Sequence, residues 1–381
     1  MKENRYSLSI ISKKHYLCNM FHLDVNRFIE EKSLFFQKDK ILVALSGGAD
    51  SVALLRVLLA LGYTCEAAHC NFHLRGKESD RDENFVRGLC NELDILLHVV
   101  HFDTQTYATK HRISIEMAAR EMRYEWFEKL RQECDASVIA VAHHRDDSVE
   151  TFLLNLIRGT GINGLKGIAP LNGHIVRPLL NVSRQDILQY LEHLHQDYVT
   201  DSTNLQDEYM RNKIRLNILP MLGELNPSVS ESIAETANRL AETSLVYNKE
   251  MAEAKNRVIK RNGNNLKAIH VERLLTEVAP ASLLFEILYP LGFKPLQIKD
   301  IFHSLSGQPG KRFISPEWEA VRDREYLLLQ TRTIESTTDP TPQLCIKTLD
   351  LSDDFIIPKE KDVACLDADK VIRPLIIRKW Q

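Results

Sequence analysis

Residues 46–51, SGGADS, have the composition of a loop that binds phosphate. Two adjacent glycines let the backbone approach an anion closely, and two serines add hydroxyl donors. The loop lies between a predicted strand and a predicted helix, whose N-terminal N–H groups and dipole favour negative charge. Because a carboxylate beside phosphate needs a cation between them, Asp50 predicts bound Mg²⁺. A tight strand-to-helix turn with a serine cap is the alternative.

A second polar cluster, HHRDDSVET at 143–151, follows another predicted strand and begins a helix. Asp146 and Glu150 are four residues apart, hence on one helix face, and Asp147 lies beside them. Ligands of parallel sheets bind at the carboxyl ends of the strands, where these carboxylates would meet magnesium and phosphate. A capped, solvated helix is the alternative for the cluster, and His143 could equally be a core histidine.

Basic residues gather locally, although the formal net charge of the chain is −3. In IEMAAREMRYEW, Arg120 and Arg123 share a predicted helix face with Glu116, where they could grip phosphate or RNA or form a surface ion pair. Arg75 stands in HCNFHLRG, the loop after the second strand. Such patches are typical of RNA-backbone binding and also of solvated helix faces. Two more segments, RGTGINGLKG and RNKIR, supply Arg158, Lys166, Arg211, Asn212, Lys213 and Arg215.

An alternation of strands and helices must position these residues. Apolar segments without polar alternation are separated by helical patterns, which is the rhythm of a buried parallel sheet in a doubly wound α/β domain. The predicted strands lie at 40–46, 64–70, 96–102 and 137–143, and the predicted helices at 50–61, 79–93, 113–132 and 146–158.

The rest of the chain predicts more helix and then a mixed unit. Helices are expected at 183–196, at 208–219 with Pro220 ending it, and at 228–260. Residues 264–330 predict a mixed α/β unit, with helices at 279–289 and 295–305 and a strand pair at 311–330. After a linker-like stretch, the last 40 residues predict short strands.

Composition excludes several classes of protein. The chain has 381 residues and 44% apolar residues, values of a soluble globular protein with two or three domains. Its seven cysteines form no C-x-x-C pair, which argues against a zinc ribbon, an iron–sulfur cluster or a disulfide framework. No apolar run is long enough for a membrane span and no secretory leader is evident, so we expect a cytoplasmic protein without membrane contact.

Two nucleotide motifs fail on context. A Walker loop would need G-x-x-x-x-G-K followed by serine or threonine, and no such string occurs. GTGING at 159–164 fits the dinucleotide string G-x-G-x-x-G, but it follows a predicted helix instead of a strand. We interpret it as a loop beside the site.

SGGADS resembles the pyrophosphate loop (PP-loop) of the N-type ATP pyrophosphatases. HCNFHLRG, IEMAAREMRY, HHRDDSVET, RGTGINGLKGI, RPLLNVSRQDI and DSTNLQDEYMRNKIRLNILP follow in the order found in the tRNA(Ile)-lysidine synthetases, over about 40–230. The resemblance implies a ligase that forms a C–N bond: ATP adenylates the C2 oxygen of the wobble cytidine in the CAU anticodon of tRNA(Ile). An amine of free L-lysine then displaces AMP, which gives lysidine, AMP and pyrophosphate.

The resemblance also implies roles for residues. The ATP site would be Ser46, Gly47, Gly48, Ala49, Asp50 and Ser51. Catalytic residues would be Asp50, Arg120, His143, Asp146, Asp147 and Glu150, with Asp50 and Asp147 at Mg²⁺, and Asp147 alternatively at the incoming lysine. Contacts to tRNA would come from Arg75, Arg123, Arg158, Lys166, Arg211, Asn212 and Arg215. Oligomeric state stays open, with a homodimer as one candidate.

Domain boundaries follow from the same resemblance. Residues 1–19 are expected to be an N-terminal extension, since Met20 begins a segment like the family's start. Residues 20–225 would be the PP-loop catalytic domain and 226–335 a helical and mixed α/β tRNA-binding domain. Residues 336–381 would begin a C-terminal domain that is truncated, because the family continues where this chain ends at RKWQ. We expect weaker recognition of the acceptor stem.

Two departures from the family's motifs affect individual site residues. Ser148 replaces a usual glutamine, and Phe72 and His73 stand where Asn-His-Gly is the commoner order. The nearest rival is a PP-loop tRNA thiolase, for which Cys70 and Cys134 are the candidate thiols. A relative coupled to a glutaminase domain is disfavoured because residue 2 is lysine instead of a nucleophilic cysteine. A non-catalytic RNA-binding protein is disfavoured by the intact carboxylates.

Overall fold

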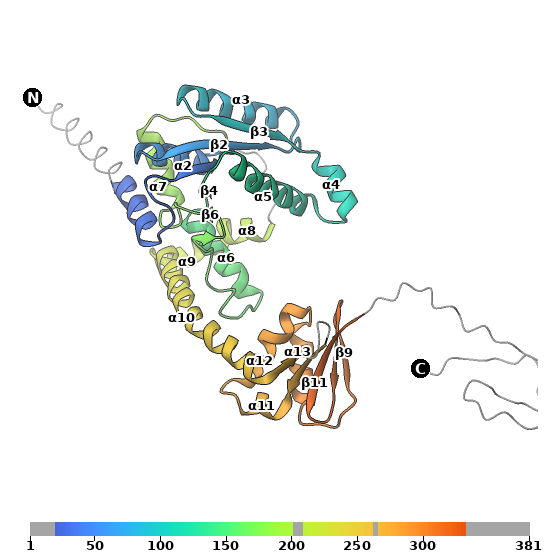
Figure 1. Cartoon of the computed structure of the whole chain (residues 1–381). Helices are drawn as coiled ribbons and strands as arrows, with labels where there is room; N and C mark the ends of the chain where they lie inside the picture. Colours follow the sequence, from blue (N-terminus) through green and yellow to red (C-terminus); the bar gives the residue numbers. More distant parts are fainter. Residues whose placement is uncertain (1–19, 201–208, 262–265, 333–381) are drawn as a thin grey trace, which may run out of the picture. The chain divides into compact units, whose positions relative to one another are not determined.

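The computed structural model describes residues 20–200, 209–261 and 266–332 (Figure 1). Two compact units divide the chain, Met1–Glu250 and Met251–Gln381. The expected extension at 1–19 and the expected C-terminal unit at 336–381 lie outside the described residues. Within the described part, no helix is long and apolar enough to cross a membrane.

The first unit contains a mainly parallel sheet. Its strand order is β3-β2-β1-β4-β6-β5, in which only β5 runs antiparallel to its neighbour. The carboxyl ends of β1, β2, β3 and β4 therefore meet at one edge of the sheet. The strands are β1 (Lys40–Ala44), β2 (Thr64–Asn71), β3 (Leu97–His101), β4 (Val138–Ala140), β5 (Leu171–Asn172) and β6 (Ile175–Val176).

Helices cover both faces of this sheet. Ile41 and Val43 of β1 pack into one core with residues of α2, α3, α7 and the helix at 20–31, whereas Leu42 packs on the other side against Phe127 of α5. Burial on both faces explains why β1 is apolar throughout. The helices are α2 (Ala49–Ala60), α3 (Lys77–Glu92), α4 (Thr104–His111), α5 (Ile115–Glu133), α6 (Arg145–Ile157) and α7 (Arg184–His193).

The predicted doubly wound domain is confirmed, with small differences. All four predicted strands and the helices between them form within a few residues of the expected positions. Helix α4 and the β5–β6 hairpin were not predicted. Each hairpin strand has two residues, too few to show a period of two, and pairing with β4 stabilises them instead.

The prediction that Pro220 ends a helix is wrong. Helix α8 (Tyr209–Lys213) continues through a π-helical turn, η2 (Ile214–Ile218), into α9 (Leu219–Leu225), where Pro220 stands in the first turn. Proline is tolerated there because the first N–H groups of a helix have no partner within it. Ile214 and residues of α9 pack with Phe152 of α6 and with α10 (Val229–Val258) in a third core of the first unit.

An antiparallel sheet with helices on one face forms the second unit. Residues 311–330 contribute three strands within the described part, not the predicted pair. The strand order is β7-β8-β11-β10-β9. Its elements are β7 (Ile259–Arg261), β8 (Leu266–His270), α11 (Val271–Thr276), α12 (Pro280–Leu288), η3 (Tyr289–Leu291), α13 (Pro295–Ser304), β9 (Arg312–Ile314), β10 (Trp318–Arg322) and β11 (Tyr326–Thr331).

The two faces of this second sheet differ in chemistry. Ala320, Leu327 and Leu329 join the apolar core formed with α12 and α13. Because side chains alternate along a strand, Glu319 and Gln330, which are directly paired, lie on the opposite face. That face is polar.

Candidate active site

The loop at 46–51 is held rigidly by its own serines. The Ser46 N–H donates to Ser51 Oγ at 3.2 Å, and Ser51 Oγ donates to the carbonyl of Gly48 at 2.9 Å. Gly47 has φ +92°, and a Cβ there would lie 3.2 Å from a methyl group of Val86. Only glycine takes up this conformation readily. The loop therefore has the preformed shape that phosphate binding requires, with Ser51 buried as its internal support.

Asp50 stands in the first turn of α2, directly after the loop. It forms an ion pair with Arg184, the first residue of α7. Its Oδ1 also lies 3.9 Å from Nε2 of His144. Arg184 further donates its backbone N–H to Asp146 at 2.8 Å. The sheet thus brings together segments that follow β1 and β4 and the start of α7.

His144 lies among three carboxylates at the start of α6. It is 4% exposed, and its Nε2 is 3.5 Å from Asp147 and its Nδ1 3.7 Å from Asp146. The Asp147 carboxylate accepts the backbone N–H of His144 at 3.0 Å and so caps the helix. The carboxylates therefore converge as predicted, around an imidazole that the sequence analysis did not single out.

Glu150 is paired with a cation instead of facing open solvent. The side chain is 1% exposed, and Arg215 donates to both of its oxygens, at 2.6 and 3.1 Å. Arg215 comes from the π-helical turn η2 and also lies 3.6 Å from Asp147. Burial raises the pKa of Glu150, and the bond from Arg215 partly opposes this. Glu150 therefore holds Arg215 beside Asp147.

His143 contacts a buried arginine, Arg177. Arg177 donates its Nε–H to Nδ1 of His143 at 3.2 Å and also bonds the carbonyl of Ala169 at 2.7 Å. Burial lowers the pKa of His143 to about 4, with Arg177 and Arg120 adding to the effect and Asp147 opposing it. Because its Nδ1 accepts a bond, the neutral ring carries its proton on Nε2, where it serves as a donor.

The remaining predicted residues are basic or polar side chains with contacts of their own. Arg120 is exposed over the ring of Tyr124, and Arg123 lies 5.1 Å from the ring centre of Phe72. Arg75 is bound to Asp82 at 2.9 Å, so its charge is already paired. The others lie nearby along the chain: Arg158 is exposed at the end of α6, Lys166 is half-buried in the next loop, and Arg211 and Asn212 are half-buried in α8.

Ser148 has a structural role at the position where the family has glutamine. Its Oγ accepts the backbone N–H of Ile168 at 3.0 Å. A Cβ at Gly167, where φ is +64°, would lie only 2.3 Å from that oxygen. This contact ties the loop after α6, which contains GTGING and Lys166, to the start of α6. The string follows a helix, as predicted.

The sequence analysis missed His144, Arg184 and Arg177. All three lie in segments that it quoted, HHRDDSVET and RPLLNVSRQDI. Their residue types gave no spacing signal, because Arg177 and Arg184 reach the site only through the turn of the chain between β6 and α7. A histidine beside two aspartates was the one available indication.

Burial disfavours thiol chemistry at the two candidate cysteines. Burial raises the pKa of Cys70 to about 12, and it also raises that of Cys134. A raised pKa favours the protonated thiol over the nucleophilic thiolate. No group of three or more histidine, cysteine or carboxylate side chains in the described ranges has metal-binding geometry.

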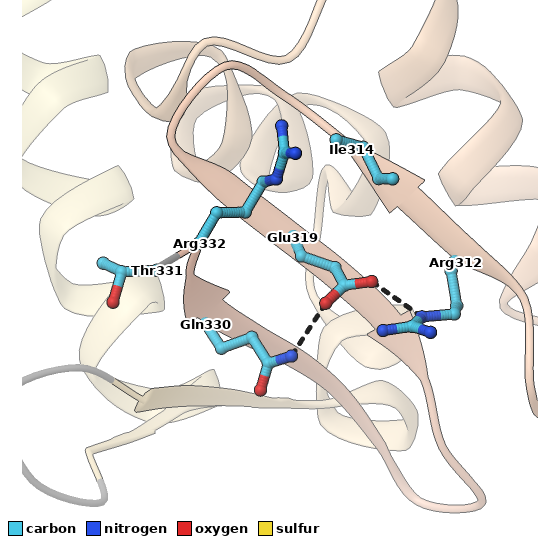
Figure 2. A pocket seen from close by; sticks show the side chains of 6 residues that line it. All are labelled: Arg312, Ile314, Glu319, Gln330, Thr331 and Arg332. Carbon is cyan, nitrogen blue, oxygen red and sulfur yellow. Dashed lines mark hydrogen bonds and ion pairs between the residues drawn. The ribbon is translucent and has the colours of Figure 1, made fainter. Parts of the chain in front are cut away.

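A hollow on the polar sheet face of the second unit is a further candidate site (Figure 2). Glu319 forms its floor and is bound by Arg312 at 2.7 Å and by Gln330 at 2.8 Å. Arg332 stands at its rim and donates to the carbonyl of Ser315 at 3.3 Å. With one carboxylate and two guanidinium groups, the hollow has an excess of positive charge. Its lining residues are Arg312, Ile314, Glu319, Gln330, Thr331 and Arg332.

Each of the two units contains a region that matches a known protein family. A model described as a PP-loop domain matches residues 19–222, and one described as the TilS substrate binding domain matches residues 261–332. A solved U34-tRNA thiolase from Methanococcus maripaludis shares the fold with a TM-score of 0.52, at 20% identity over 60% of this chain and 80% of that one. Fold and phosphate loop together define a PP-loop protein that uses ATP.

Two relatives identify the family within that class. The tRNA(Ile)-lysidine synthase of Bacteroides thetaiotaomicron is 58% identical over 95% of this chain and 84% of its own length. That of Parabacteroides distasonis is 46% identical over 94% of this chain and 83% of its own. This chain belongs to the tRNA(Ile)-lysidine synthase family. The predicted family, fold and ATP-dependent C–N ligase class are confirmed.

We predict that Arg215→Ala destabilises the first unit. The change leaves the buried Glu150 carboxylate without its partner, which should cost about 3 kcal/mol and lower the melting temperature by roughly 5–10 °C. Calorimetry measures the shift. Arg158→Ala removes an exposed arginine and is the matched control. Equal melting temperatures for the two variants would contradict the role assigned to the pair.

We also predict that His143 stays neutral down to about pH 5. Its pKa of about 4 is below the ordinary 6.5, so the folded state binds fewer protons than the unfolded chain between these values. Its contribution to stability is therefore present above pH 6.5 and is lost as the pH falls through about 4. NMR titration of ¹³C-histidine-labelled protein measures this, with His143→Gln to assign the signal. A midpoint above pH 6 would refute the prediction.

Proposed function

We propose that this chain adenylates the wobble cytidine of tRNA(Ile) with a CAU anticodon and then joins free L-lysine to it in the cytoplasm. One observation carries the proposal: the phosphate loop after β1 and the carboxylates after β4 meet around His144, with Arg184 between Asp50 and Asp146. A loop suited to a triphosphate thus lies beside a cluster of carboxylates that could attract an amine substrate. Membership of the tRNA(Ile)-lysidine synthase family supports the choice of substrate.

In the first step, the cytidine C2 oxygen attacks the α-phosphorus of ATP and pyrophosphate leaves. The loop N–H groups and the N-terminus of α2 would stabilise the phosphate charge. The guanidinium group of Arg184 lies next to the loop and would stabilise the negative charge of the departing pyrophosphate. The reacting base must leave its stack, which an anticodon loop permits at low cost.

Magnesium fits this site as a shared ligand of protein and nucleotide. Mg²⁺ is commonly held by one or two carboxylates together with substrate phosphates, so a cluster of three protein ligands is not required. Asp50 and Asp147 would hold it, since both approach the same nitrogen of His144. When bound, the ion neutralises charge on the phosphates. Arg184 would share Asp50 with it.

In the second step, a lysine amine attacks C2, and AMP leaves with the former C2 oxygen. The amine must lose a proton, and the carboxylates around His144 offer both an anionic surface and a proton acceptor. Glu150 has both oxygens bonded to Arg215, so we assign it to positioning. Asp147 is assigned to magnesium or, alternatively, to the lysine ammonium group. His143 would donate from Nε2 to phosphate.

Binding of tRNA would involve both units, through phosphate contacts. In the first unit we propose Arg120, Arg123, Arg158, Lys166, Arg211 and Asn212, whereas the predicted Arg75 already pairs with Asp82 and would support its own loop. In the second unit we propose the hollow of Figure 2, with Arg332 as its available guanidinium group. Arg312 already pairs with Glu319, so its role is to support the floor.

The decisive test is release of pyrophosphate from ATP, measured with purified protein, tRNA(Ile) with a CAU anticodon and lysine. We expect release that needs this tRNA, with lysine incorporated into it. Asp50→Asn should lower kcat/KM by about 100-fold or more, because it removes charge at the phosphates. Asp80→Asn is the matched control, because it makes the same change at an exposed residue of α3. Pyrophosphate release without lysine uptake would instead indicate a thiolase or another acceptor.

Arg332→Ala should weaken tRNA binding several-fold and leave the KM for ATP unchanged. Loss of one phosphate contact should also reduce the slope of log Kd against log salt concentration by about 1. Arg332→Lys keeps the charge and should retain most of the slope. Filter binding at several salt concentrations measures both. An unchanged slope in the alanine variant would remove the hollow from the tRNA surface.

A further inference from the structure

Two histidine side chains are hydrogen-bonded to each other at the carboxyl edge of the first sheet. His101 is the last residue of β3, and His73 follows the end of the neighbouring β2. Nε2 of His73 and Nδ1 of His101 are 2.9 Å apart, the ring planes differ by 17° and the ring centres are 5.0 Å apart. A separation of 5.0 Å is nearly the largest that a 2.9 Å edge contact allows. The rings are therefore in edge contact, with nearly parallel planes.

A network of buried polar groups contacts both histidines. Glu83 Oε2 lies 3.6 Å from Nε2 of His101 and accepts a bond from Asn71 at 2.9 Å. The Asn71 amide oxygen accepts the backbone N–H of His73 at 3.0 Å. Nε2 of His73 and Nδ1 of His101 share one hydrogen bond, and Nε2 of His101 faces the Glu83 carboxylate.

The backbone of His73 supports a functional reading of the pair. Its φ of +52° lies in the left-handed region, which a non-glycine residue enters at a cost. Strain of this kind persists where the surroundings hold the side chain in a required place.

Both rings are exposed, and the His101 side chain is 53% accessible. Two nearly parallel, hydrogen-bonded imidazoles together present an extended aromatic surface to solvent. Bases of single-stranded RNA stack on such surfaces, histidine included. Phe72, stacked on Phe102 and covered by Arg123, lies in the same segment and adds aromatic and positive character.

The position of the pair relative to the phosphate loop suggests which base it binds. In the sheet, β2 separates β3 from β1, and adjacent strands lie about 4.8 Å apart. Ala44 at the end of β1 pairs with Ala68, whereas His101 at the end of β3 pairs with Asn71, three residues further along β2. The carboxyl end of β3 is thus roughly 14 Å from that of β1, within reach of a nucleotide next to the one that reacts. We propose that the His73–His101 pair stacks a base of the anticodon loop adjacent to the wobble cytidine. This inference rests on the proposed function.

Fluorescence tests the stack directly. The probe is tRNA(Ile) in which 2-aminopurine replaces the adenine of the CAU anticodon, titrated with the full chain. Stacking on wild-type protein should quench the fluorescence. His73→Ala with His101→Ala should abolish the quenching and raise the Kd by about 5- to 30-fold, as expected for loss of one base–aromatic stack, without changing the KM for ATP. His73→Phe with His101→Phe should restore quenching, since it restores aromatic area.

His174→Ala is the matched control, because this exposed histidine precedes β6 at the opposite, amino-terminal edge of the sheet. Undiminished quenching and an unchanged Kd in the double alanine variant would overturn the stacking role. So would a double phenylalanine variant that behaves like double alanine, since the pair would then act through its nitrogens. If wild-type protein neither binds nor modifies this tRNA, the proposed function itself fails.

Discussion

The ion pair between Arg184 and Asp50 joins the parts of the candidate site. Three carboxylates after β1 and β4 would repel one another if they were alone, and the arginine offsets this by pairing with Asp50 and donating its backbone N–H to Asp146. His144 lies among the same carboxylates, and the N-termini of α2 and α6 add positive dipole ends. A cluster of carboxylates can therefore exist beside a loop suited to hold phosphate.

The pair between the buried Glu150 and Arg215 is a second contact that supports the carboxylate cluster. Glu150 would be costly without a partner, because burying a bare carboxylate loses its hydration. Arg215 satisfies both oxygens, and it comes from a π-helical turn instead of a regular helix. Such turns often occur at functional sites, where they redirect a side chain. The same turn allows Pro220 to begin α9.

Recognition of RNA is compatible with an overall acidic chain because its cations are distributed unevenly. Several arginines are already paired within the protein, Arg75 with Asp82 and Arg312 with Glu319 among them. Affinity would then depend on the remaining guanidinium groups and on aromatic surfaces. Stacking is worth about 1–3 kcal/mol per base, more than one exposed ion pair, so a few exposed rings matter as much as net charge.

The sequence by itself determined the fold class, the phosphate loop and the carboxylate cluster. Their signals are local: uninterrupted apolar strands buried on both faces, two glycines before a helix, and carboxylates four residues apart. The family followed from the order of several motifs. Boundaries of regular helices between strands were also predictable to within a few residues.

Tertiary structure decided which groups face one another. Arg184 and Arg177 reach the site only after the chain turns between β6 and α7, and no spacing records that. Glu150 looked like a free carboxylate until Arg215 was seen beside it. The contact between His73 and His101 forms only because β2 and β3 pair in the observed register. Such pairings depend on the packing of segments remote in sequence, whereas periodicity reports only on neighbours along the chain.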